Sequence, residues 1–117
     1  MDLRITTTLA GVLVLMASVA GAQPQGRVIG RVLDQTSAVL PGVAIDLVAN
    51  STELTATTDA NGHYRFEGVP TGIAELTFRL LNFSVLRRVV HVTSGASATA
   101  DAVLSLSLTA DVIVTAS

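Results

Sequence analysis

The stretch TTDANGHYRF at residues 57–66 decides the fold of this chain. Asp59 and the pair Asn61-Gly62 form a strong turn signal, because Asn and Gly tolerate the positive φ angles of tight hairpin turns. Directly after the turn, Tyr64 and Phe66 alternate with polar side chains. A period of two is typical of a strand with one buried face. The stretch therefore predicts two strands joined by a turn, with both aromatic rings in the core.

The same alternation continues on both sides of this stretch, from Gly26 to Leu106. Turn sequences such as Leu40-Pro41-Gly42 interrupt it. This spacing predicts an all-β fold, a seven-stranded antiparallel β-sandwich, with strands at about 26–34, 43–49, 53–58, 63–67, 73–80, 87–93 and 98–106. In the last strand, one face of the alternation consists of Ala100, Ala102, Leu104 and Leu106.

Residues 1–22 have the features of a secretory signal peptide. Arg4 precedes an apolar run, Leu9–Ala17, and Ala20-Gly21-Ala22 supplies the small residues that signal peptidase requires. We therefore expect export and cleavage between Ala22 and Gln23. The alternative is an uncleaved membrane anchor, although the apolar run is short for a bilayer span. The mature chain has no second apolar segment of membrane length.

Composition narrows the possible functions. The net charge is −2 and the basic residues are scattered, whereas nucleic-acid binding requires a dense basic surface. The sequence contains no Cys, which excludes disulfides, thiolate metal sites and lipid attachment through a thiol. Aromatic residues make up 3% of the chain, so few rings are present on which a ligand could stack. An exported domain of this kind must be stabilised by its core alone.

No catalytic, cofactor or metal site is predicted from the residues. His63 and His91 lie at outward positions of the expected strands and belong to no metal-binding motif. Asp59-Ala60-Asn61-Gly62 resembles the start of a calcium loop but lacks a later bidentate acid, so a plain turn is expected. Residues 95–99 begin like a nucleophile elbow and lack its last Gly, which favours a polar hairpin loop.

Four segments together resemble the carboxypeptidase regulatory-like domain: GRVIGRVLD at 26–34, LPGVAIDL at 40–47, TTDANGHYRF at 57–66 and VPTG at 69–72. The resemblance implies a transthyretin-like sandwich of the wider carbohydrate-binding-like fold. It also implies an accessory module, found beside carboxypeptidase catalytic domains or at the N-terminus of TonB-dependent outer-membrane receptors. The chain departs from the family where Gly is usual in the turn at 35–38, at Ala74, where an aromatic is common, and at Asn82, where Gly is common.

The C-terminus resembles the TonB box of those receptors. An acidic residue is followed by alternating β-branched residues and then Thr-Ala, in the order Asp111, Val112, Ile113, Val114, Thr115 and Ala116. The resemblance implies that this segment pairs with an edge strand of a TonB-type periplasmic protein by β-augmentation. In the alternative, the segment completes an edge of the domain's own sheet. The expected organisation is a signal peptide at 1–22, a sandwich at 23–108 and a TonB-box-like tail at 109–117.

The leading hypothesis is a non-catalytic exported binding module that acts through protein–protein contact, as the N-terminal domain or a truncated fragment of a TonB-dependent receptor. Its expected location is the periplasm, the outer membrane or the outside of the cell. One alternative is a carbohydrate-binding module, which exposed aromatic side chains in a shallow groove would favour. Another is an accessory domain of a carboxypeptidase on a separate chain. No cofactor is expected in any of these cases.

Overall fold

A computed structural model describes residues 24–107 of the chain. These residues form eight strands and no helix, so none of them forms a helix that could cross a membrane. The strands are β1 (Gln25–Asp34), β2 (Ala44–Ala49), β3 (Thr52–Thr57), β4 (His63–Pro70), β5 (Gly72–Arg79), β6 (Leu86–Val92), β7 (Ser97–Thr99) and β8 (Ala102–Leu104). The prediction of an all-β fold is confirmed.

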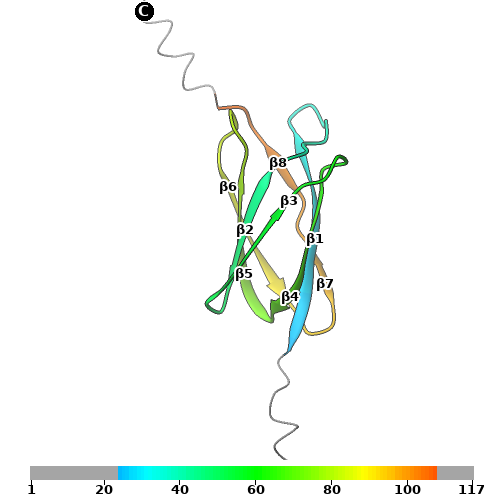
Figure 1. Cartoon of the computed structure of the whole chain (residues 1–117), viewed down its shortest axis with the longest axis vertical. Coiled ribbons are helices and arrows are strands. Elements are labelled where there is room, and N and C mark those ends of the chain that lie inside the picture. The colour runs from blue at the N-terminus through cyan, green and yellow to red at the C-terminus, as the bar shows by residue number, and fades with distance from the viewer. Residues whose placement is uncertain (1–23, 108–117) are drawn as a thin grey trace, which may run out of the picture.

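The strands lie in two sheets that pack face to face (Figure 1). One sheet has the order β4-β1-β7, with β8 also paired to β1, and the other has the order β3-β2-β5-β6. In Figure 1, β1 begins at the lower end of the sandwich and the described chain leaves β8 at the upper end. The sandwich predicted from the alternation is therefore present.

One part of the predicted antiparallel arrangement is wrong, because β1 pairs in parallel with both β7 and β8. The turn after β6 carries the chain from one sheet to the other, and parallel pairs require such a crossover. The predicted strand 98–106 is also divided into β7 and β8. Between them, the carboxylate of Asp101 accepts a hydrogen bond from the backbone N–H of Arg31 at 3.0 Å, in place of a backbone acceptor.

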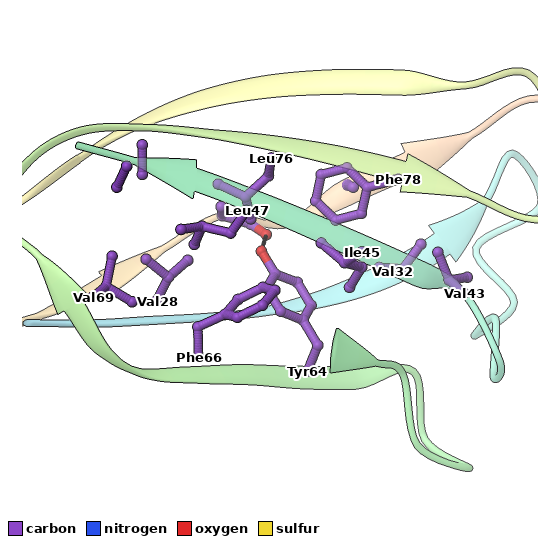
Figure 2. Packing of buried hydrophobic residues seen from close by; sticks show 14 of the residues in the cluster. Val28, Val32, Val43, Ile45, Leu47, Tyr64, Phe66, Val69, Leu76 and Phe78 are labelled. Carbon is purple, nitrogen blue, oxygen red and sulfur yellow. Dashed lines mark hydrogen bonds between the residues drawn. The ribbon is translucent and has the colours of Figure 1, made fainter. Parts of the chain in front are cut away.

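Inward-facing side chains of both sheets form a single core (Figure 2). Tyr64 and Phe66 point from β4 into this core, where each is at most 5% exposed. The ring centroid of Tyr64 lies 5.9 Å from that of Phe66 and 5.7 Å from that of Phe78, in edge-to-face arrangements. The core position predicted for the first two rings is confirmed. Ala74, where the family often has an aromatic residue, is fully buried.

The last residue of the alternation at 100–106 does not share the burial of the others on its face. Leu106 is 54% exposed, although Ala100, Ala102 and Leu104 are buried as expected. Leu106 lies beyond β8 and forms an isolated bridge with Phe83. The next residue, Ser107, donates its backbone N–H to the carbonyl of Asn82 at 2.8 Å. The chain has thus left the inner face of the sheet at this point, which ends the alternation.

Turns with left-handed residues join the strands. Asn50 and Ser51 have φ angles of 48° and 67°, as expected for a two-residue type I′ hairpin turn between β2 and β3. Asn82, which replaces the usual Gly, adopts a φ of 75°. In the turn at 35–38, the carboxylate of Asp34 accepts hydrogen bonds from the backbone N–H groups of Thr36 and Ala38. These bonds help to fix a turn that lacks the family's Gly.

Thr58 is a buried polar residue whose side chain connects two loops through hydrogen bonds. Its hydroxyl donates to the carbonyl of Leu40 at 2.6 Å and accepts from the backbone N–H of Val43 at 2.9 Å. The side chain is therefore fully satisfied, as a buried hydroxyl must be.

We expect Thr58→Val to lower the free energy of unfolding by about 2–4 kcal/mol, because it leaves a buried donor and a buried acceptor without partners. Thr58→Ser keeps the hydroxyl and is the matched control, with a smaller loss. Urea denaturation of both variants measures the difference. Equal losses in the two variants would contradict the role of the hydroxyl.

Candidate binding surfaces

A large hollow in the described part of the chain lies on the outer face of the β4-β1-β7 sheet and extends to β3. Its volume is about 760 Å³. It is lined by residues of β1, β4 and β7, most of them outward-facing, by the end of β3 and by neighbouring connections: Ile29, Gly30, Arg31, Ala56, Thr57, Asp59, His63, Tyr64, Arg65, Thr99 and Asp101. The hollow is open to solvent and its rim is polar. We refer to it as the outer cleft.

Charges beside the outer cleft are partly neutralised by one another. Arg27 Nε lies 3.0 Å from Glu67 Oε1, and Arg65 Nε lies 3.5 Å from Glu67 Oε2. Arg31 lies between His63 of β4 and Asp101, and its backbone N–H is bonded to Asp101. All three ion-paired side chains are about half exposed or more, so these pairs contribute little to stability. The cleft has no strong charge of one sign that would select a charged ligand.

The turn at Asp59 is a plain Asx turn, as predicted. The Asp59 carboxylate accepts hydrogen bonds from the backbone N–H groups of His63 at 2.9 Å and Asn61 at 2.8 Å. These bonds, first of all the one from His63, hold the pKa of Asp59 below its usual value. The carboxylate of Asp59 thus stabilises the turn in which it lies.

Both histidines are exposed on strands, His63 on β4 and His91 on β6, as the alternation predicts. They lie in different sheets. Within residues 24–107, no three His, Cys, Asp or Glu side chains form a group that could hold a metal ion.

The segment at 95–99 differs from the expected hairpin loop. It connects β6 in one sheet to β7 in the other, with Gly95 at a φ of 71° and a hydrogen bond from the backbone N–H of Ala96 to the carbonyl of Thr93. Ser97 is the first residue of β7, and its hydroxyl accepts a hydrogen bond from Arg27 at 3.3 Å. The segment is therefore a crossover turn, and the serine is bound to an arginine.

None of the four aromatic side chains of the chain is exposed. Tyr64, Phe66 and Phe78 are buried and Phe83 is partly buried. The Tyr64 hydroxyl donates to the backbone carbonyl of Ala100, and burial raises the pKa of this phenol. Stacking on an exposed ring is thus not possible on the described surface.

The site residues predicted at the two ends lie outside the described residues. These are Ala22 and Gln23 at the expected cleavage site and the segment from Asp111 to Ala116. The outer cleft was not predicted from the sequence, because its walls come from strands that are distant in the chain. Alternation identifies the outward residues but not which strands lie together.

A scan of family models matches residues 27–105 to the carboxypeptidase regulatory-like domain. Among curated proteins, no sequence matches significantly. Solved structures with a similar fold include the Bacillus anthracis TIE protein, at 16% identity and a TM-score of 0.64 over 71% of this chain. A 3-chlorocatechol 1,2-dioxygenase from Rhodococcus opacus is 10% identical, with a TM-score of 0.61 over 74% of this chain. A candidate carbohydrate-binding protein from Bacteroides uniformis is 23% identical, with a TM-score of 0.55 over 69%.

This chain spans 17%, 62% and 41% of the lengths of those three structures. At such identities the likeness concerns the fold alone. The family match is of a different kind, because it covers most of the chain and includes the four segments on which the resemblance rests, apart from Gly26. The chain belongs to the carboxypeptidase regulatory-like domain family.

Proposed function

We propose that this chain is a non-catalytic, exported binding module of the kind found at the N-terminus of TonB-dependent receptors. In this proposal the segment Asp111–Ala116 pairs with a TonB-type periplasmic protein. The observation that supports it is the place of this segment in the chain. The segment follows shortly after Ser107, where the described part of the sandwich ends.

The closure of the sandwich supports the proposal. All the buried apolar residues of the described chain lie between Val28 and Leu104. After β8, the carbonyl of Ser105 accepts a hydrogen bond from Ser84, and Ser107 donates to Asn82. These bonds hold the end of the domain against the loop between β5 and β6. The buried apolar residues of the described part thus all precede Ser105.

The chemistry of the segment supports a partner strand. Val112, Ile113 and Val114 are β-branched residues, which favour the extended conformation. An extended segment binds a sheet edge through its backbone N–H and C=O groups, while alternate side chains set the register. The carboxylate of Asp111 makes the first residue of this segment polar.

A carbohydrate-binding function has less support. Its expected feature was a groove with exposed aromatic side chains, and all four aromatic residues are buried or partly buried. The outer cleft offers polar side chains from β1 and β4, but no ring face for a sugar.

The proposal predicts that deletion of residues 111–117 abolishes binding to a purified TonB C-terminal domain and leaves the melting temperature nearly unchanged. Isothermal titration calorimetry measures the first effect and circular dichroism the second. Val114→Pro is also expected to abolish binding, because proline removes a backbone donor from the strand. Ser117→Pro is the matched control outside the segment, with binding retained.

Two results would contradict the proposal. Unchanged binding after the deletion would show that the partner is recognised elsewhere. Unfolding after the deletion would show that the segment belongs to the domain's own sheet.

A further inference from the structure

The two sheets of the sandwich have four edges, and three of them are protected against pairing with another chain. Strand β6 carries the adjacent charges Arg87 and Arg88. The side chain of Arg88 also donates a hydrogen bond of 2.6 Å to the carbonyl of Asp101, which lies in the other sheet between β7 and β8. The edge formed by β7 and β8 consists of two strands of three residues each. Strand β4 presents alternating charges, and its pairing with β1 shifts register between Gly26 and Val28. Charges, short strands and irregular pairing are the usual protection of sheet edges.

The fourth edge, β3, lacks these features. Its sequence is TELTAT, with no Pro, no Lys or Arg and a single charge at Glu53. All six residues pair with β2 in an unbroken register, from Thr52 with Ala49 to Thr57 with Ala44. Strand β3 is thus regular, β-branched and nearly uncharged, which is the kind of edge that accepts a further strand.

The hairpin turn determines which backbone groups of β3 face this edge. A two-residue turn at Asn50-Ser51 makes Ala49 and Thr52 the first hydrogen-bonded pair. In an antiparallel ladder, hydrogen-bonded and non-hydrogen-bonded pairs then alternate. Thr52, Leu54 and Ala56 therefore bond to β2, while the N–H and C=O groups of Glu53, Thr55 and Thr57 point to the open edge.

Within the described residues, no strand pairs with β3 on the side away from β2. The outer cleft reaches Ala56 and Thr57 at the end of β3. A smaller hollow of about 290 Å³ lies over the neighbouring strands β2, β3 and β5 and is lined in part by Glu53, Thr55 and Thr77. The side chains of Glu53, Thr55 and Thr57 are exposed, and these residues make no backbone pairing other than with β2 among the described strands.

We propose that β3 is a dimerisation edge, at which a second copy of this chain adds its own β3 in antiparallel orientation about a two-fold axis. The axis passes beside Thr55, so that Thr55 faces Thr55 of the second copy. Glu53 of each copy then faces Thr57 of the other, and Leu54 faces Ala56 on the inner side. This joins the two four-stranded sheets into one continuous sheet.

This register is selected by the backbone and by charge. With Thr55 on the axis, the hydrogen-bonding groups of Glu53, Thr55 and Thr57 all find partners, whereas an axis at Leu54 leaves Thr57 unpaired. The single acidic side chain of the strand meets a threonine and avoids its own copy, since like charges placed opposite each other destabilise a sheet. A two-fold contact of this kind is closed, so it gives a dimer and no fibre.

Two lysine substitutions on the same exposed face test both the edge and the register. Thr55→Lys places two lysines opposite each other on the axis and is expected to weaken the dimer at least tenfold. Thr57→Lys places a lysine opposite Glu53 of the second copy and is expected to tighten it. Sedimentation equilibrium of the exported chain, over a range of concentrations and at low salt, measures the dissociation constant of each form. Val89→Lys, on the exposed face of β6, is the control and is expected to leave the constant unchanged.

A wild-type chain that remains monomeric at every concentration would overturn the proposal. So would a dimer whose dissociation constant does not respond to either β3 substitution, because its interface must then lie elsewhere. A dimer tightened by Thr55→Lys would overturn the register, since an axis at Leu54 places residue 55 opposite Glu53. No TonB-type protein is present in these measurements, so their outcome is independent of the partner proposed for residues 111–116.

Discussion

Phe66→Ala is expected to lower the free energy of unfolding by about 3–5 kcal/mol, the usual range for removal of a buried aromatic ring. Phe66 is 3% exposed and lies on β4 beside Tyr64, whose ring it meets edge to face. Removing it leaves a cavity between the two sheets, and the surrounding side chains come from paired strands that cannot easily close it. A domain of this size has only about 5–10 kcal/mol of stability in total, so the variant should lose a large part of it.

Urea denaturation followed by circular dichroism measures this loss. Val89→Ala is the control, because Val89 is 60% exposed and its truncation should change the stability by less than about 0.5 kcal/mol. A melting temperature that is the same for Phe66→Ala and the wild type would show that β4 buries its other face.

Gly30→Ala is expected to have an effect of similar size, although it adds only one methyl group. A Cβ at this position of β1 would lie 2.1 Å from the carbonyl oxygen of Ala100 and 2.6 Å from Cε2 of Tyr64. The first contact is with the backbone between β7 and β8, and the same carbonyl accepts the hydrogen bond of the Tyr64 hydroxyl. Relief of the clash must therefore move a strand connection or remove that bond. We expect a loss of about 3 kcal/mol, at the upper end of the usual range for overpacked cores.

Gly42→Ala separates this clash from the general effect of replacing glycine. At Gly42 a Cβ would meet no atom within 4 Å, but the φ of 78° is unfavourable for alanine. The expected loss is about 1–2 kcal/mol, from backbone strain alone. If Gly30→Ala costs no more than Gly42→Ala, the close approach of β1 to the Ala100 carbonyl is not present in solution.

The sequence by itself determined most of the strands, their buried faces and most of the turns, but not the division of the strand at 98–106 or the crossover at 95–99. Tyr64 and Phe66 could be assigned to the core because alternation is a local signal, fixed by the geometry of an extended chain. The Asn61-Gly62 turn and the left-handed Asn82 follow from residue types that accept a positive φ. The order and spacing of four short segments were enough to indicate the family, which the model match over residues 27–105 confirms.

The tertiary structure alone decided which strands are neighbours. The parallel pairing of β1 with β7 and β8 and the exposure of Leu106 depend on where the chain crosses between sheets. The role of Thr58 depends on two loops that meet only in the folded domain. The open edge of β3 has the same origin, because its Thr-rich sequence would serve equally well inside a sheet. Alternation states which way a side chain points, whereas pairing is decided by contacts between residues far apart in the chain, and a local pattern carries no information about these.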